Sequence, residues 1–282
     1  CTQDLKDKDY INSHNLVMVT KQGQVKKTSL EKYSKPRVNG VAAITIKEGD
    51  ELLEAKLTNG ESQIILAVKS GKLVRFEETK TRPMGRTASG VRGISLKDET
   101  DEVIGMVTVD KDDINDTQIL VVTENGYGKR TKLVDEDGED VYRITNRGGK
   151  GVKTLNITEK TGKLISISNV TDADDLMIIN KSGLTIRMAV EDLRVMGRAT
   201  QGVKLINLKG NDSIAAVTKV MKDDVAEVVV DEDGNVIETE AIERVKPVLE
   251  VLEDDGVEDD DDSDEEDEIE DDEDSEEAGD ED

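Results

Sequence analysis

The chain has 282 residues, with 38 lysines and arginines against 65 aspartates and glutamates, and a formal net charge of −27. This length suits one large domain or two ordinary ones, and it excludes a peptide hormone or a disulfide-stabilised miniature. Taken over the whole chain, the negative charge argues against a nucleic-acid-binding protein.

The first residues indicate the compartment. Cys1 is the only cysteine and His14 the only histidine, so the sequence offers neither an internal disulfide nor a zinc site. It contains no run of eighteen apolar residues and no signal-peptide pattern, which predicts a soluble, cytoplasmic protein without membrane contact. Because the chain starts at a cysteine followed by a polar run to Asp9, we expect it to be a piece of a longer protein.

Four segments of the next two hundred residues share one pattern. In each, an apolar, mostly β-branched run leads to a polar turn with glycine, and a basic second run follows. Glycine supplies the positive φ of a tight turn, so each segment predicts a β-hairpin. The turn glycines are 48, 55 and 57 residues apart: Gly23, Gly71, Gly126 and Gly183.

Two further elements follow each hairpin. The first contains an arginine, a glycine and an apolar run, and it spans residues 37–44, 86–94, 147–155 and 198–206. A short apolar strand then closes each unit, at 52–53, 103–104, 164–165 and 214–215. About four strands per fifty residues is typical of a propeller blade, although the absence of tryptophan excludes the Trp-Asp type. The prediction is an all-β, propeller-like body with repeats near 11–60, 61–115, 116–173 and 174–221.

The charge divides the chain at the end of these repeats. Residues 222–282 contain 33 acidic and three basic residues, whereas residues 1–221 contain 32 acidic and 35 basic residues. The sequence therefore predicts a mildly basic body, residues 1–221, followed by a strongly acidic tail, residues 222–282.

Basic residues recur at fixed places in the repeats. Placed around an axis, they would form a belt suited to a phosphate backbone, with binding that tolerates sequence and depends on salt. The alternative is that they only keep exposed strands soluble. Four lie four residues after the turn glycine, three lie four residues before the second glycine, and three lie two residues after it: Lys27, Arg75, Arg130 and Arg187; Arg86, Arg147 and Arg198; Arg92, Lys153 and Lys204.

One of these segments has an unusual density of glycine. It reads Arg147, Gly148, Gly149, Lys150, Gly151. Glycine lets backbone amides approach a phosphate closely, and the flanking bases add fixed charge, which favours a small phosphate clamp. A flexible surface loop would have the same composition.

Several stretches together resemble the C-terminal domain of DNA gyrase A. They are residues 84–94, Met-Gly-Arg-Thr-Ala-Ser-Gly-Val-Arg-Gly-Ile, and the corresponding stretches 125–130, 180–187 and 196–204. The resemblance covers about residues 11 to 220. The family's signature box, Gln-Arg-Arg-Gly-Gly-Lys-Gly, is matched in its last five positions by residues 147–151. That box usually lies in the first blade of the family, whereas the match here lies in the third repeat.

The resemblance implies a six-bladed β-pinwheel of four-stranded blades, of which four are present and two would lie upstream of Cys1. It implies bending of duplex DNA around a basic rim, so that ATP-dependent strand passage introduces negative supercoils. The cleaving tyrosine would lie in the N-terminal part of gyrase A and ATP hydrolysis in gyrase B, within an A2B2 heterotetramer. This chain would then carry no catalytic residue, metal or cofactor, because Mg²⁺ and ATP are used elsewhere in the complex. The alternatives are the corresponding domain of topoisomerase IV and a propeller-like interaction scaffold.

The last thirty residues contain 23 acidic residues and no basic one. Such a run repels itself and cannot bury a core, which predicts disorder. It serves either as a solubilising tail or as a DNA mimic that competes for the basic rim. Between body and tail, residues 228–237 are compatible with a small hairpin.

Overall fold

The structure is a computed structural model, which describes residues 7–35, 37–210, 212–221, 229–230 and 236–237. Contacts divide the chain into residues 1–252 and 253–282. The predictions for the acidic tail fall on residues outside the described ranges, apart from one short hairpin. In it, β16 (Val229–Val230) pairs with β17 (Val236–Ile237) in antiparallel register.

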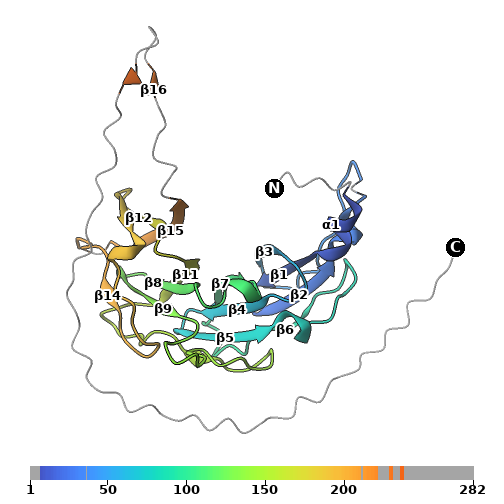
Figure 1. The fold of residues 1–282 in the computed structure, drawn as a ribbon, viewed down its shortest axis with the longest axis horizontal. Helices are drawn as coiled ribbons and strands as arrows, with labels where there is room; N and C mark the ends of the chain where they lie inside the picture. Colours follow the sequence, from blue (N-terminus) through green and yellow to red (C-terminus); the bar gives the residue numbers. More distant parts are fainter. Residues whose placement is uncertain (1–6, 36, 211, 222–228, 231–235, 238–282) are drawn as a thin grey trace, which may run out of the picture. The chain divides into compact units, whose positions relative to one another are not determined.

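The described body is all-β, as predicted, and consists of four antiparallel sheets (Figure 1). The short helix α1 (Lys8–Ser13) precedes them, and its N-terminus is capped by the side chain of Asp7. None of the helices in the described ranges has the length and apolar character needed to cross a membrane.

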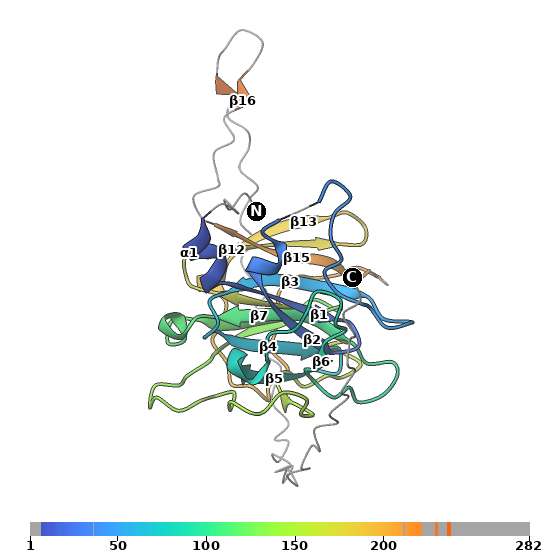
Figure 2. The same ribbon diagram turned by 90° about the vertical axis from the view of Figure 1, so that its right-hand side faces the viewer.

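Each repeat contributes a hairpin and an inner strand to its own sheet. Sheet 1 has β1 (Asn15–Thr20), β2 (Gln24–Ser29) and β3 (Leu52–Thr58), and sheet 2 has β4 (Gln63–Val68), β5 (Lys72–Glu77) and β7 (Val103–Val109). Sheet 3 has β8 (Gln118–Thr123), β9 (Tyr127–Lys132) and β11 (Leu164–Val170), and sheet 4 has β12 (Asp174–Asn180), β13 (Thr185–Ala189) and β15 (Ile214–Met221). Figure 2 shows β7, β4 and β5 side by side in that order.

The fourth strand of a sheet comes from the next repeat, an exchange that the sequence pattern does not predict. Sheets 1, 2 and 3 end in the two-residue strands β6 (Val91–Arg92), β10 (Val152–Lys153) and β14 (Val203–Lys204), respectively. Sheet 4 has three strands among the described residues. One-turn 3-10 helices lie between the main strands: η1 (Leu30–Tyr33), η2 (Glu78–Lys80), η3 (Lys111–Asp113) and η4 (Val190–Asp192).

The apolar core lies between neighbouring sheets. Three buried clusters occur, and each combines side chains of two adjacent hairpins; Val17 and Val25 of sheet 1, for example, share a cluster with Ile64 and Phe76 of sheet 2. Valine, isoleucine and leucine dominate because β-branched and aliphatic side chains pack well on pleated strands. The inner strands β3, β7, β11 and β15 follow one another in contact, so the edge with β6, β10 and β14 is the outer one.

Candidate nucleic-acid interface

The three exchanged strands present bases at the outer edge of the sheets. Val91 and Arg92 pair with β2, and Val152 and Lys153 pair with β5. Val203 and Lys204 pair with β9 in the same way. The predicted bases two residues after the second glycine therefore lie on the outermost strands of three successive sheets.

Docking of these strands depends on the glycine that precedes each of them. Gly90, Gly151 and Gly202 have φ values of 101°, 75° and 81°, which side chains other than glycine rarely adopt. A β-carbon on Gly151 would lie 2.6 Å from the carbonyl oxygen of Leu73, and the other two glycines approach a backbone carbonyl just as closely. The glycines serve the exchange of strands between repeats.

Residues 147–151, predicted as a phosphate clamp, instead join two repeats. The Gly148 amide donates to the Gly93 carbonyl at 2.7 Å, and the Ser95 amide donates to the Gly149 carbonyl at 2.9 Å. The side chain of Arg147 reaches back to the Lys80 carbonyl, with an Nε to oxygen distance of 3.1 Å. The clamp interpretation is wrong for Gly148, because its amide is already bonded within the protein. Gly149 and Lys150 are exposed to solvent.

The four bases that follow the hairpin glycines do not form a surface belt, and this prediction is wrong. Only 1–8% of each residue is exposed, and each base is paired with a carboxylate. Lys27 binds Glu78 at 2.9 Å, Arg75 binds Asp140 at 2.8 Å, Arg187 binds Asp175 at 2.7 Å, and Arg130 pairs with Asp172.

Their common position explains the burial. The residue four places after the turn lies where the next repeat docks, and the Lys27 carbonyl accepts from the Met84 amide at 2.8 Å. The Arg75 carbonyl accepts from Thr145, and the Arg130 carbonyl from Met196, each at 2.9 Å. A buried charge needs a partner, and the junction supplies a carboxylate or backbone carbonyls. The fourfold recurrence is a signature of the fold.

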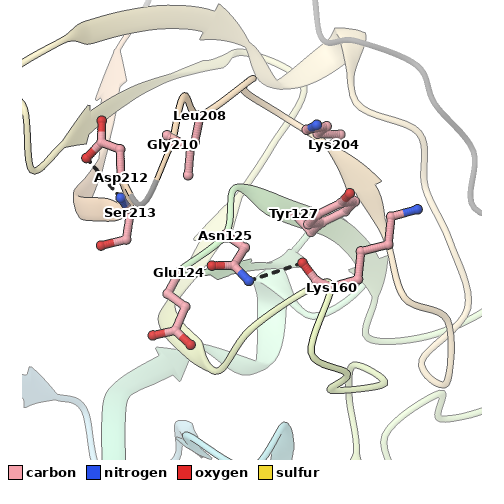
Figure 3. Close-up of a pocket in the computed structure, with 9 residues that line it drawn as sticks. All are labelled: Glu124, Asn125, Tyr127, Lys160, Lys204, Leu208, Gly210, Asp212 and Ser213. Atoms are coloured by element: carbon pink, nitrogen blue, oxygen red, sulfur yellow. Dashed lines mark hydrogen bonds between the residues drawn. The ribbon is translucent and has the colours of Figure 1, made fainter.

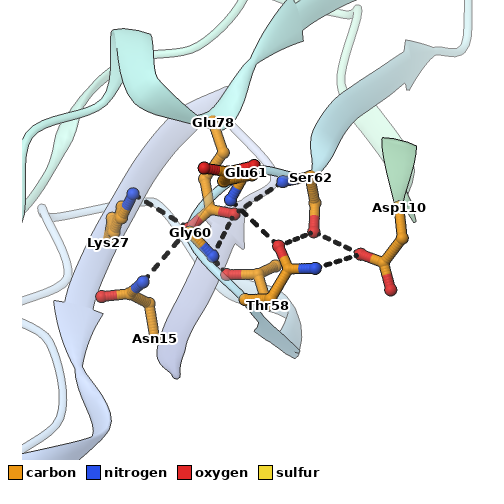
Figure 4. Close-up of polar contacts among 9 residues, drawn as sticks. Asn15, Lys27, Thr58, Gly60, Glu61, Ser62, Glu78 and Asp110 are labelled. Carbon is orange, nitrogen blue, oxygen red and sulfur yellow. Dashed lines mark hydrogen bonds and ion pairs between the residues drawn. The ribbon is translucent and has the colours of Figure 1, made fainter. Parts of the chain in front are cut away.

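The first junction shows how completely such a carboxylate is satisfied (Figure 4). Glu78 is fully buried between sheets 1 and 2. Besides Lys27, its oxygens accept from the Thr58 hydroxyl at 2.8 Å and from the amides of Gly60 and Ser62 at 3.1 and 3.3 Å. These contacts tie both strands of one repeat to the start of the next.

Two buried lysines hold the loops that carry other predicted bases. Lys26 donates to the Ala43 carbonyl at 2.7 Å and to the Arg86 carbonyl. Lys129 donates to the Arg198 carbonyl and its neighbours. Burial lowers the pKa of Lys26 from 10.5 to about 8, because the ammonium is removed from water. Sequence reasoning missed both residues, although each lies three places after a turn glycine.

The exposed outer bases lie in segments without any acidic residue. Residues 32–47, 79–97, 141–158 and 193–211 contain 4, 5, 4 and 4 bases, respectively, and no aspartate or glutamate. Within the described part of the chain, no ion pair forms at Arg92, Lys150 or Lys153, all exposed, or at the half-buried Arg86, Arg198 and Lys204. The absence of acids is the signal that would have found the remaining exposed bases of three segments: Lys80, Arg82, Lys97, Arg143, Arg194 and Lys209.

A pocket of about 370 Å³ lies at the end of sheet 3, beside Lys204 (Figure 3). Lys160 and Tyr127 line it together with Glu124 and Asp212. Because cationic and anionic side chains share its walls, its charge does not select an anion. The described residues contain no group of three or more histidine, cysteine or acidic side chains that could hold a metal ion.

Comparison with known proteins agrees with this architecture. The profile described as "DNA gyrase C-terminal domain, beta-propeller" matches residues 14–59, 63–110, 117–171 and 174–221, which is more than half of the chain. The chain belongs to this family. The four matched segments correspond to the four hairpin-containing sheets, and the fold class inferred from the sequence is confirmed.

Individual relatives carry the name of one gyrase polypeptide. The DNA gyrase A polypeptide of Staphylococcus epidermidis is 45% identical over 209 residues, covering 74% of this chain and 22% of the relative. That of Staphylococcus aureus strain MRSA252 is 42% identical over 245 residues, covering 85% of this chain and 26% of the relative. The chain thus spans about a quarter of these relatives.

Solved structures show the same fold in two kinds of topoisomerase. A C-terminal domain of DNA topoisomerase IV superposes with a TM-score of 0.68 at 25% identity, covering 76% of this chain and 64% of that one. A DNA gyrase A C-terminal domain superposes with a TM-score of 0.62 at 24% identity, covering 76% and 68%.

Proposed function

We propose that this gyrase C-terminal domain binds duplex DNA along its outer edge and bends it. Residues 1–221 would form the binding domain, and residues 222–282 a separate acidic tail. The observation that supports this most directly is the series Arg92, Lys153 and Lys204, one base on the outermost strand of each of three sheets, within acid-free segments.

Such an edge suits a phosphate backbone more than base readout. Lysine and arginine neutralise phosphates and release counterions, which makes binding tolerant of sequence and steep in salt. Bending a site of 20–30 base pairs by 40–90° costs about 1–6 kcal/mol, so several weak contacts must act together. A series of bases on successive sheets provides contacts spaced along the duplex.

Within a whole enzyme, this bending would present DNA to the cleavage gate of gyrase A, so that ATP-dependent strand passage introduces negative supercoils in the cytoplasm. Cleavage would belong to the rest of gyrase A, and ATP hydrolysis to gyrase B, in an A2B2 complex. Relatives named as DNA gyrase A at 42–45% identity favour gyrase over topoisomerase IV, although the topoisomerase IV fold is also similar.

The test compares two triple variants of equal charge. R92Q/K150Q/K153Q removes exposed outer bases, and K8Q/K111Q/K181Q removes exposed lysines outside the acid-free segments. We expect the outer variant to reduce the salt dependence of duplex affinity, d log K/d log[salt], by about 2–3, at roughly 0.9 per phosphate contact, and the control variant to leave it nearly unchanged.

Wrapping itself is measured by nicking and religating a relaxed plasmid in the presence of the chain. The proposed bending predicts a shifted distribution of linking number with the wild type and a smaller shift with the outer variant. Equal effects of both variants on the salt slope would show a contribution of net charge alone. An unshifted linking number with bound protein would favour the scaffold alternative.

A further inference from the structure

The exchange of strands between repeats leaves one acceptor edge empty and one donor segment undocked. At the three occupied junctions, the donor residue four places after the second glycine is buried in the preceding sheet: Ile94, Leu155 and Ile206 are 1%, 1% and 5% exposed. The backbone beside it also bonds to the turn glycine of that sheet. Gly93 donates to the Gly23 carbonyl at 2.8 Å, for example, and the other two junctions repeat this bond at the same length.

The empty acceptor is the outer edge of β13 in sheet 4. Gly183 occupies the place of the turn glycines in the other sheets, where an added β-carbon would meet the incoming donor at 2.6–3.0 Å. At Gly183 such an atom meets no described residue within 4 Å. The next residue, Leu184, is 53% exposed. An uncovered strand edge with an apolar side chain is a template for pairing with another strand.

The undocked donor is the segment Gly40–Val41–Ala42–Ala43–Ile44 of the first repeat. It matches the docked donors Gly-Val-Arg-Gly-Ile at 90–94 and Gly-Val-Lys-Leu-Ile at 202–206. Gly40 already has the required positive φ, +74°, yet a β-carbon there would have no described atom within 4 Å. Ile44 is half-buried where its counterparts are buried, and no strand forms over residues 37–46. The segment is held from its own repeat, where Tyr33 donates to the Ala43 carbonyl at 3.1 Å.

We propose that Gly40–Ile44 of one copy of this chain adds to the outer edge of β13 in a second copy. The register of the internal junctions places Val41 opposite Thr185 and Ala42 opposite Leu184, since Val91 and Arg92 lie opposite Val25 and Gln24 in sheet 1. Ile44 then occupies the position of Ile94, Leu155 and Ile206. The second copy is the occupant because donor and acceptor coexist on one chain and are unfilled at the same time.

This contact joins unlike surfaces, so each copy keeps a free donor or a free acceptor after the first association. Head-to-tail contacts of this kind extend into chains of copies or close into rings. The association therefore grows with protein concentration beyond a dimer. It needs no DNA, so it is independent of the proposed function and is tested without DNA.

Sedimentation velocity of the full chain tests the association. We expect the weight-average mass to rise with concentration, and a peptide of residues 37–46 in excess to return it to the monomer. I44D and L184D should each abolish the rise, and because both side chains are partly exposed in the monomer, their melting temperatures should stay near that of the wild type. A monomer at every concentration reached by the wild type would overturn the proposal.

Cross-linking tests the register. C1S/A42C and C1S/L184C each carry one cysteine, so mild oxidation of their mixture should yield the heterodimer in large excess over either homodimer. C1S/D112C, with a cysteine at another exposed site, mixed with C1S/L184C is the control and should give only statistical cross-linking. Equal yields from the two mixtures would contradict strand addition at β13, even if the chain associates.

Discussion

The guanidinium of Arg75 lies 2.8 Å from the carboxylate of Asp140, although 65 residues separate the two along the chain. The same guanidinium donates to the Tyr142 carbonyl at 2.9 Å, and its Nε donates to Gln63 at 2.8 Å. One side chain of sheet 2 thus fixes the segment that leads to its own fourth strand. The recurrence of a base at this position reflects assembly of the repeats.

We predict that R75A lowers the free energy of unfolding by about 2–4 kcal/mol, because it leaves a buried pocket with unpaired acceptors. Denaturant unfolding measures this change. K111A, which removes an exposed lysine paired with Glu61 at 3.4 Å, is the control and should cost less than about 1 kcal/mol. Duplex affinity of folded R75A should stay close to that of the wild type. Normal stability combined with a large loss of affinity would restore Arg75 to the surface.

A second prediction concerns the glycine that admits the exchanged strand. G151A adds both the strain of a positive φ and a contact of 2.6 Å with the Leu73 carbonyl. G40A adds the same strain, since Gly40 has a φ of 74°, without any described atom within 4 Å. We expect G40A to cost about 1 kcal/mol and G151A clearly more, about 2–4 kcal/mol. Thermal unfolding of the two variants isolates the cost of displacing the strand, and equal losses would mean that β10 adapts without cost.

Much of this architecture could be predicted from periodicity. The hairpins follow from β-branched runs that end in Asn-Gly or Ser-Gly, and the repeat length follows from the spacing of their glycines. The partner of each short outer strand could not be predicted, because Val152 and Lys153 are only two residues and their pairing with β5 is a contact between repeats. A single repeat does not reveal that its fourth strand comes from the following one.

The candidate interface was predictable in part for a related reason. A buried Arg75 and an exposed Arg92 are alike in sequence, and only their surroundings distinguish them. The carboxylate that pairs with Arg75 lies beyond the end of its own hairpin, whereas Arg92 lies in an acid-free segment. Local absence of acids was therefore a better signal for free surface charge than recurrence of bases.

The last prediction concerns the pH dependence of stability conferred by Lys26. Its pKa is about 8 in the folded chain against 10.5 ordinarily, because burial disfavours the ammonium. Below pH 8 both states hold the proton and the cost of burying the charge is fully present. Between pH 8 and 10.5 the unfolded state holds more protons than the folded state, so stability conferred by Lys26 rises with pH.

The measurement is the difference in unfolding free energy between wild type and K26M at intervals from pH 7 to 10.5. The difference should shift in favour of the wild type as the pH rises through this window, because a neutral amine still donates to the Ala43 and Arg86 carbonyls at a lower desolvation cost. NMR titration of the Lys26 side chain gives its pKa directly. A value near 10.5 would mean that these carbonyls stabilise the ammonium enough to offset its burial, and the pH-dependent shift would then be absent.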